Sequence, residues 1–330
     1  MFNHLKKYGW NDVFETQFQN IVLEHKKPDV VPGRVISVHR TNYDVMTNDK
    51  QIVCEITGNR LKDKDPHSKP LVGDWVVVEL GEHDNANIII DILERRTVLE
   101  RRKVHSDVDV QLIAGNVDTA ILVQSLANDF NIARIERVLV QLADAKIKPL
   151  IILNKLDIAE NIEQARDDMK RIDASIPVIY SSFKTCEGLN LIEAFLESNE
   201  TVIFIGSSGV GKSSIINTML DDAEQQKTKE VSDYSGKGKH TTTARKLFVL
   251  DNGVIVIDTP GTREFGLTGE DTEALNESFS QIEELSSRCK FRDCGHAKEP
   301  QCAIQNALAS GELDSALFEN YRKLEQEVNK

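Results

Sequence analysis

A glycine-rich segment between an apolar run and an amphipathic stretch constrains this chain more than any other feature. The apolar run Thr201–Ile205 predicts a strand, residues 212–220 predict a helix, and the segment between them reads G-x-x-x-x-G-K-S. Glycines let backbone N–H groups curl around phosphates, and the N-terminus of the following helix adds its dipole. The strand before and the helix after the motif indicate a nucleotide-binding α/β domain. The expected phosphate-binding residues are Gly206, Ser207, Ser208, Gly209, Val210, Gly211, Lys212, Ser213 and Ser214.

A D-x-x-G motif, residues 258–261, ends a second apolar strand. Alone it is a common turn. Beside a phosphate loop, Asp258 can hold Mg²⁺ through water and the amide of Gly261 can meet the γ-phosphate. We expect Lys212 to reach the β- and γ-phosphates as a catalytic residue, and the hydroxyl of Ser213 to ligate Mg²⁺.

An N-K-x-D motif ends a third apolar strand and consists of Asn154, Lys155, Leu156 and Asp157. A carboxylate at Asp157 can accept two hydrogen bonds from guanine, whereas adenine does not offer these two donors. A site built to form both bonds therefore rejects adenine. Alone the motif is as often a surface turn, but beside the phosphate loop it predicts GTP rather than ATP. Ser181 and Ser182 end the next strand, where a backbone amide can meet the guanine O6.

The order of these motifs is unusual. In ordinary GTPases the phosphate loop comes first and N-K-x-D fourth. Here N-K-x-D precedes the phosphate loop, which is followed by the run Thr241-Thr242-Thr243 and then by D-x-x-G. This order predicts a circular permutation of the GTPase domain.

The periodicity of the chain predicts a multi-domain protein with four segments. Residues 1–29 are expected to form a short helical extension. Residues 30–104 carry five short β-branched runs, which predict a small β-barrel of the OB-fold type, with a barrel that has no binding role as the alternative. In residues 105–268, strand-like runs alternate with amphipathic helices, as in βαβ units of an α/β domain. Residues 269–330 are expected to bind a metal, with helices over 271–287 and 313–328 that flank the metal ligands.

Three of the five cysteines fall within fourteen residues, and a histidine lies among them. Cys289, Cys294, His296 and Cys302 make a Cys₃His set that suits one structural, tetrahedral Zn²⁺. Buried structural cysteines are the alternative. The other two, Cys54 and Cys186, are expected to be small core residues.

With these motifs, the chain resembles the RsgA (YjeQ/YloQ) family of bacterial GTPases that depend on the small ribosomal subunit. The resemblance covers roughly residues 30–305. It is carried by the permuted motifs, by Gly238-Lys239-His240-Thr241-Thr242-Thr243 and by the cysteine cluster. It implies an OB-fold, a permuted GTPase domain and a zinc domain that contact the maturing small subunit.

The residue that activates water is not evident from the GTPase motifs alone. Position 262 is Thr, where many GTPases place the Gln that orients the attacking water, so we expect slow intrinsic hydrolysis. His240 is the candidate replacement, because an imidazole can accept a hydrogen bond from water near neutral pH. In the resembling family a histidine at this place is the proposed catalytic residue. We expect Thr241 or Thr242 to ligate Mg²⁺.

The net charge of −13 argues against a protein that coats nucleic acid through charge alone. Two local basic clusters remain candidates for RNA contact, or else solvated faces: Arg95, Arg96, Arg101, Arg102 and Lys103, and then Arg288, Lys290, Arg292 and Lys298. No apolar run approaches the ~20 residues that a membrane helix needs. We expect a cytoplasmic protein without a membrane partner.

The sequence therefore predicts a monomeric GTPase that acts late in maturation of the small ribosomal subunit. Its partners would be GTP, GDP, that subunit and its rRNA, and hydrolysis would be stimulated by the subunit and coupled to release. Two alternatives remain. One is a GTPase with a protein partner away from the ribosome, and the other is a GTP-gated binding module without stimulated turnover.

Overall fold

The computed structural model describes residues 2–25, 29–63, 65–82, 85–102, 110–127, 129–170, 172–207, 209–219, 245–258, 282, 285–291, 294–296, 299, 301–310, 312–313 and 318. The chain divides into two compact units, residues 1–266 and 267–330. No helix among the described residues is both long and apolar enough to cross a membrane.

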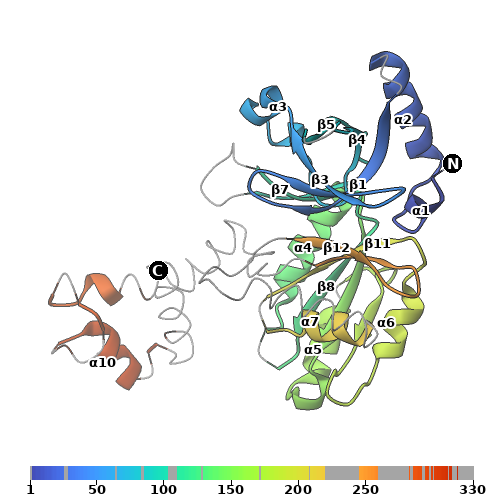
Figure 1. Cartoon of the computed structure of the whole chain (residues 1–330). Helices are drawn as coiled ribbons and strands as arrows, with labels where there is room; N and C mark the ends of the chain where they lie inside the picture. Colours follow the sequence, from blue (N-terminus) through green and yellow to red (C-terminus); the bar gives the residue numbers. More distant parts are fainter. Residues whose placement is uncertain are drawn as a thin grey trace. The chain divides into compact units, whose positions relative to one another are not determined.

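The first unit begins with two helices and a closed barrel (Figure 1). The helices are α1 (Asn3–Lys6) and α2 (Asp12–His25), and the barrel strands are β1 (Val30–Val38), β2 (Tyr43–Thr47), β3 (Gln51–Ile56), β4 (Trp75–Glu79) and β5 (Asn87–Ile92). Strands pair in the order β1-β2-β3-β5-β4, and β4 pairs back with β1, so no edge is left open. The five-stranded, OB-like barrel expected from the sequence is confirmed.

The N-terminal helices pack on this barrel through an aromatic cluster. Trp10 and Phe14 of the extension contact Trp75 of β4, with ring centroids 4.8 and 5.6 Å apart. Leu5 and Phe18 belong to the same buried cluster. The helical extension expected from the sequence therefore completes the hydrophobic core on one side of the barrel.

Three short elements were not expected from the sequence. The helix α3 (Gly58–Lys62) and the 3₁₀ turn η1 (Pro66–Ser68) connect β3 to β4 within the barrel, and a ribbon of β6 (Val98–Arg102) with β7 (Val110–Gly115) lies between the barrel and the α/β domain in the sequence. The ribbon pairs Arg102 with Val110, so it joins residues on both sides of the expected boundary at 104/105.

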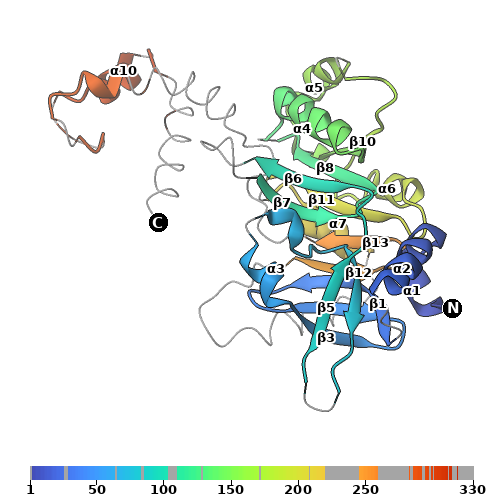
Figure 2. The same cartoon turned by 90° about the horizontal axis from the view of Figure 1, so that it is seen from above.

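The α/β domain alternates strands and helices. In chain order these are β8 (Thr119–Ser125), α4 (Ile132–Asp144), β9 (Lys148–Asn154), the 3₁₀ turn η2 (Leu156–Ile158), α5 (Ile162–Met169), β10 (Val178–Tyr180), α6 (Leu189–Phe195), β11 (Thr201–Ile205), α7 (Lys212–Met219), β12 (Lys246–Val249) and β13 (Ile255–Asp258). The sheet order is β10-β9-β8-β11-β13-β12, parallel except for the antiparallel β12 (Figure 2).

Helices cover both faces of this sheet, as expected for βαβ units. Residues Ile135, Val138 and Leu142 of α4 pack into a core on one face. Ile192 of α6 and Ile215 of α7 pack into a core on the other. Alternate residues of the central strands, such as Ile121 and Leu122 of β8, point into the two different cores, which is why the middle of these strands is a continuous apolar run.

The barrel and the α/β domain share one sheet, because β1 pairs with β12 through Ser37 and Lys246. Arg34 of β1 reinforces the junction from a buried position. It donates hydrogen bonds to the carbonyl oxygens of Tyr8 and Gly73 and to the hydroxyl of Thr201, which begins β11. One guanidinium thus ties the extension, the barrel and the α/β sheet together.

The second unit contains one complete described helix, α10 (Ala303–Ser310), which the sequence reading missed. Its residues Ile304 and Ala307 pack with Ile282, Leu285 and Cys302 in a small core. Residues 285–287 are helical, as expected for the end of the segment 271–287, whereas most of the helix expected at 313–328 lies outside the described residues.

Candidate nucleotide and metal sites

The predicted nucleotide motifs all follow strands of the parallel part of the sheet. Asn154 ends β9, Ser181 follows β10, Gly206 follows β11 and Asp258 ends β13. Carboxyl ends of parallel strands lie along one edge of a sheet, where ligands of open α/β folds bind. These motifs, although permuted in the chain, therefore lie along one edge of the sheet.

Two glycines of the phosphate loop occupy positions that no other residue fits. Gly206 has φ +140°, and a Cβ there would lie 2.1 Å from the carbonyl oxygen of Val123. Gly211 has φ +108°, and a Cβ would lie 2.2 Å from the side-chain nitrogen of Asn154. The loop thus passes close to β8 and to the N-K-x-D segment, and only glycine allows this approach.

Lys212, the first residue of α7, is folded back onto the loop. Its Nζ donates to the carbonyl oxygens of Gly206 (2.6 Å) and Ser207 (2.7 Å). Burial lowers the pKa of Lys212, and the carboxylates of Asp258 and Asp129 act in the opposite direction. The ammonium is therefore held in the loop by acceptors that phosphate oxygens can replace.

Asn154 connects the N-K-x-D segment to the phosphate loop. Its buried side chain donates from Nδ2 to the carbonyl oxygen of Val210 (2.8 Å) and accepts at Oδ1 from the hydroxyl of Ser181 (3.3 Å). The asparagine expected to support its own loop thus joins three of the predicted motifs.

The expected base-reading carboxylate, Asp157, is oriented by Ser182. The Ser182 hydroxyl donates to Asp157 Oδ1 at 2.7 Å, and the Lys184 ammonium lies 4.0 Å from Oδ2. Lys155 before it has φ +65°, and the amide of Leu156 donates to the carbonyl of Ser181 (3.0 Å). These bonds hold the segment against the loop that follows β10.

The amides of Ser181 and Ser182 are already engaged. The Ser181 amide donates to the carbonyl of Leu153 (2.9 Å), and the Ser182 amide donates to that of Glu187 (3.0 Å). The expectation that one of these two amides meets the guanine O6 therefore does not fit this structure. In this arrangement the Ser182 side chain contacts Asp157 instead.

Two polar residues near the phosphate loop were not anticipated, namely Asp129 and Arg134. Arg134 Nη1 donates to the hydroxyl of Ser207 at 3.0 Å. The signal in the sequence is weak: the pair follows the buried strand β8, so it comes from the same carboxyl edge as the motifs. Of the predicted residues, Ser208, His240, Thr241, Thr242 and Gly261 lie outside the described residues.

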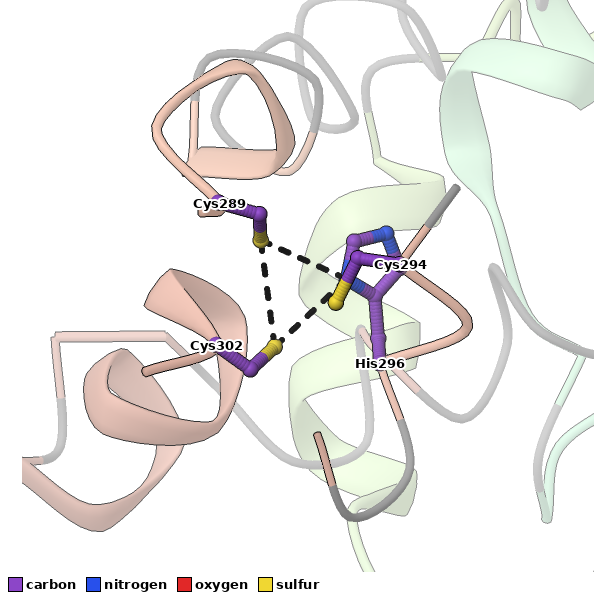
Figure 3. Close-up of side chains that lie close together, drawn as sticks. All are labelled: Cys289, Cys294, His296 and Cys302. Carbon is purple, nitrogen blue, oxygen red and sulfur yellow. Dashed lines mark hydrogen bonds between the residues drawn. The ribbon is translucent and has the colours of Figure 1, made fainter. Parts of the chain in front are cut away.

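The four predicted metal ligands come together in the second unit (Figure 3). Cys289, Cys294, His296 and Cys302 present ligand atoms that all lie within 4.8 Å of one another. Cys289 Sγ and Cys302 Sγ are 3.8 Å apart, and His296 Nδ1 lies 3.6 and 3.5 Å from them. Zinc–sulfur bonds of about 2.3 Å in a tetrahedron separate the sulfurs by roughly 3.8 Å, so the residues fit such an ion.

Neighbouring groups prepare this cluster for a cation. The Ser286 hydroxyl lies 3.2 Å from His296 Nε2, which leaves Nδ1 for the cluster. Burial raises the pKa of the Cys289 thiol, but hydrogen bonds from the backbone of Ala303 and Ile304 and from the thiols of Cys302 and Cys294 together outweigh it, so the pKa is lowered overall. A thiolate, the form that binds metals, is therefore favoured there.

Part of the first basic cluster is internal. Arg95 is 9% exposed and donates to the fully buried carboxylate of Asp74 (2.7 Å), and Arg96 pairs with Asp118 (3.0 Å). The expectation of a basic surface is therefore wrong for Arg95. In the second cluster, the Lys290 ammonium lies 5.8 Å from the centre of the exposed Phe291 ring.

Comparisons with known proteins agree with this architecture. The profile of the RsgA GTPase family matches residues 92–268. "Small ribosomal subunit biogenesis GTPase RsgA 1" of Bacteroides thetaiotaomicron is 38% identical over 99% of this chain and 90% of its own length. The protein of the same name from Listeria innocua is 39% identical over 98% of this chain and 89% of its own.

A solved structure shows the same arrangement of elements. The crystal structure of YjeQ from Thermotoga maritima is 25% identical, covers 90% of this chain and 98% of its own, and has a TM-score of 0.52. The sequence matches extend over nearly the whole chain, and Asn154, Ser181, Gly206 and Asp258 of the permuted motifs all lie at the ends of parallel strands. The chain belongs to the RsgA GTPase family, and it is a GTP hydrolase.

Proposed function

We propose that this GTPase acts in late maturation of the small ribosomal subunit, with hydrolysis stimulated by the subunit and coupled to its own release. The observation that carries the proposal is the similarity, over nearly the full length of both chains, to proteins named as small-subunit biogenesis GTPases. Similarity over the barrel, the GTPase domain and the metal-binding unit makes a shared partner the simplest inference.

In this proposal guanine is read by Asp157. Its carboxylate accepts from the base N1–H and exocyclic amine, while the hydroxyl of Ser182 fixes its rotamer. Asn154 holds the base-reading segment and the phosphate loop at a constant separation, because it bonds to Val210. The segment that reads the base and the loop that binds the phosphates are thus linked by this side-chain hydrogen bond.

Phosphate chemistry is assigned to the loop and its neighbours. Lys212 leaves the carbonyls of Gly206 and Ser207 and takes up phosphate oxygens, while the amides of the loop donate to the phosphates. Ser213 and Asp258, with Thr241 or Thr242, offer the oxygen ligands that Mg²⁺ prefers. The ion, when bound, neutralises charge that develops on the γ-phosphate. His240 is proposed to orient the attacking water, in the place of a glutamine.

The Cys₃His cluster is proposed to hold one structural zinc ion. All four positions of a tetrahedron are filled by protein atoms, which leaves no open site for chemistry. The ion would tie Cys289 and Cys302 across the small core of the second unit. Phe291 is exposed beside Lys290 and is a candidate for stacking on an rRNA base.

The protein is proposed to act as a cytoplasmic monomer, as ribosomal subunits mature in the cytoplasm of bacteria such as those that carry the relatives. Co-sedimentation with purified small subunits tests the proposal. With a non-hydrolysable GTP analogue we expect the protein in the subunit pellet, and with GDP in the supernatant. Equal pelleting in both states would contradict release on hydrolysis. Absence from the pellet in both would favour a partner other than the ribosome.

A further inference from the structure

An ion pair between the loop after β8 and the first turn of α4 reaches the phosphate loop. Arg134 Nη1 donates to Asp129 Oδ1 at 2.8 Å and to Ser207 Oγ at 3.0 Å. Ser207 is the second residue of the G-x-x-x-x-G-K-S motif. The Arg134 side chain, 73 residues away in sequence, therefore holds the beginning of the phosphate loop.

The backbone around Arg134 is fixed independently of this contact. Asn131 caps α4, since its Oδ1 accepts from the amide of Arg134 at 2.9 Å. The buried side chain of Gln124 in turn accepts from the Asn131 amide (2.9 Å) and donates to the Asn131 carbonyl (3.3 Å). The arginine thus projects from a rigid turn, so its guanidinium has a defined position beside Ser207.

Both members of the ion pair are shielded from solvent. The side chains of Arg134 and Asp129 are 19% and 20% exposed, and Arg134 Nε and Asp129 Oδ2 are buried without a hydrogen-bond partner among the described residues. The guanidinium and the carboxylate stabilise each other in this shielded position, because removal of one would leave the other charge unpaired and poorly solvated. Asp129 therefore holds Arg134 in the rotamer that reaches Ser207.

Ser207 receives hydrogen bonds from two cationic side chains. Its carbonyl oxygen accepts from Lys212 Nζ (2.7 Å), and its hydroxyl accepts from Arg134. To reach the β- and γ-phosphates, the Lys212 ammonium has to give up the loop carbonyls. The bond from Arg134 does not involve Lys212, so it can continue to hold Ser207 when the lysine has moved.

We propose that Arg134, held by Asp129, is a positioning residue for the phosphate loop: it fixes Ser207 so that the loop keeps its shape when Lys212 transfers to the phosphates. The inference rests on the proposed nucleotide site. Arg134 acts through Ser207 and not on the reacting atoms. It should therefore strengthen binding of GDP and GTP alike, and it should leave kcat at saturating GTP nearly unchanged.

Arg134→Gln, Ser207→Ala and the double variant test this with a fluorescent GDP analogue. We expect each single variant to weaken GDP binding by roughly 10-fold, chiefly through faster dissociation, because a hydrogen bond to a charged donor is lost. Since both substitutions remove the same bond, the double variant should bind no more weakly than either single variant. Arg134→Lys, which keeps the charge and a donor, should recover part of the affinity.

Arg166→Gln is the matched control, because Arg166 pairs with Glu163 on α5 and is half-exposed. It should bind GDP as the unsubstituted protein does. Thermal unfolding without nucleotide shows whether each variant is folded. Because Ser207→Ala removes only a hydroxyl, it tests the hydrogen bond between Arg134 and Ser207 even if Arg134→Gln is unstable.

Three results would each overturn the positioning role. They are additive losses of GDP affinity in the double variant, unchanged GDP affinity in both single variants, and a fall in kcat with GDP affinity retained. Lys212→Ala separates this result from the proposed site itself. If Lys212→Ala loses GDP binding and Arg134→Gln does not, only the positioning role fails. If Lys212→Ala binds GDP normally, the nucleotide site is wrong and the inference falls with it.

Discussion

At the proposed base site, the orientation of the Asp157 carboxylate would decide which purine is accepted. Asp157 receives a hydrogen bond from Ser182 on one oxygen and lies 4.0 Å from the Lys184 ammonium on the other. With its rotamer fixed in this way, the carboxylate presents two acceptors to a base. Guanine offers two donors at matching positions, N1–H and the exocyclic amine, whereas adenine does not.

Asp157→Asn should therefore exchange the preferred base. The amide oxygen can still accept from N1–H, but the amide nitrogen meets the exocyclic amine of guanine donor to donor. Xanthine has a carbonyl there, which accepts from the amide. We expect GTP binding to weaken by roughly 10- to 100-fold and XTP binding to become the stronger of the two. Competition of GTP and XTP for a fluorescent nucleotide measures this, and unchanged discrimination would show that Asp157 does not read the base.

A second residue-scale prediction concerns the buried ion pair beneath the barrel. Asp74 is fully buried and accepts from Arg95 Nη2 (2.7 Å) and from the amide of Leu71 (2.7 Å). Asp74→Ala removes the carboxylate that neutralises the 9% exposed Arg95 and leaves it only the carbonyl oxygens of His67 and Lys69, so we expect a loss of about 3 to 5 kcal/mol in the free energy of unfolding. Urea unfolding measures it.

The control for Asp74 is the solvent-exposed pair of Lys170 and Asp167. Asp167→Ala should leave the urea midpoint nearly unchanged, because solvent screens such pairs. Equal effects of the two substitutions would mean that the Asp74 pair contributes no more than a surface contact.

These residues show where sequence reasoning succeeds and where it ends. Asp157, Lys212 and Gly206 were predictable, because nucleotide chemistry requires those residue types at a fixed local spacing. The roles of Arg34 and Arg134 were not, since each bonds to a residue more than seventy positions away and arginine has no local pattern that announces burial. Arg95 was expected at a surface for the same reason.

At the scale of elements, apolar periodicity predicted the strands and helices of the barrel and the sheet well. It missed α10, an eight-residue helix, because the segment is short and lies just after the last metal ligand. It also missed the β6–β7 ribbon, in which only a few apolar residues, such as Leu99 and Ile113, reach the core of the α/β domain. The N-terminal helices were expected, but their role depends on Trp75, which tertiary packing brings to Trp10 and Phe14.

The five thiols should react in three classes. Cys186 was expected to be a core residue, but it is exposed in the structure, so that expectation is wrong and the thiol should be labelled in the native protein. Cys54 is fully buried, and burial together with the nearby Asp44 carboxylate raises the pKa of its thiol to about 12, so it should stay unreactive until the barrel unfolds. The three clustered cysteines should become reactive only when a chelator removes their metal.

Thiol titration should therefore count one group in the native protein, four after chelation and five in denaturant. Cys186→Ser should reduce each count by one. Zinc analysis of the same samples connects the change to the ion. Four reactive thiols before chelation in a sample that contains stoichiometric zinc would show that the cluster does not hold it.

At the scale of the whole molecule, the domain that carries the nucleotide motifs and the barrel share one sheet. β12, which follows the threonine run in the sequence, pairs with β1, and the Ser37 hydroxyl donates to the carbonyl of Arg245 (3.2 Å). Arg34 makes a second link from the barrel to the start of β11, the strand that leads into the phosphate loop. A partner that binds the barrel thus contacts a body continuous with the nucleotide site.

The most direct test of the account is GTP hydrolysis measured with and without purified small ribosomal subunits, with Lys212→Ala as the blank and large subunits as the control. We predict slow hydrolysis by the protein alone, at least a roughly tenfold rise with small subunits, and no rise with large subunits or with Lys212→Ala. The same slow rate with and without small subunits would contradict it and would favour a GTP-gated binding module whose turnover the ribosome does not stimulate.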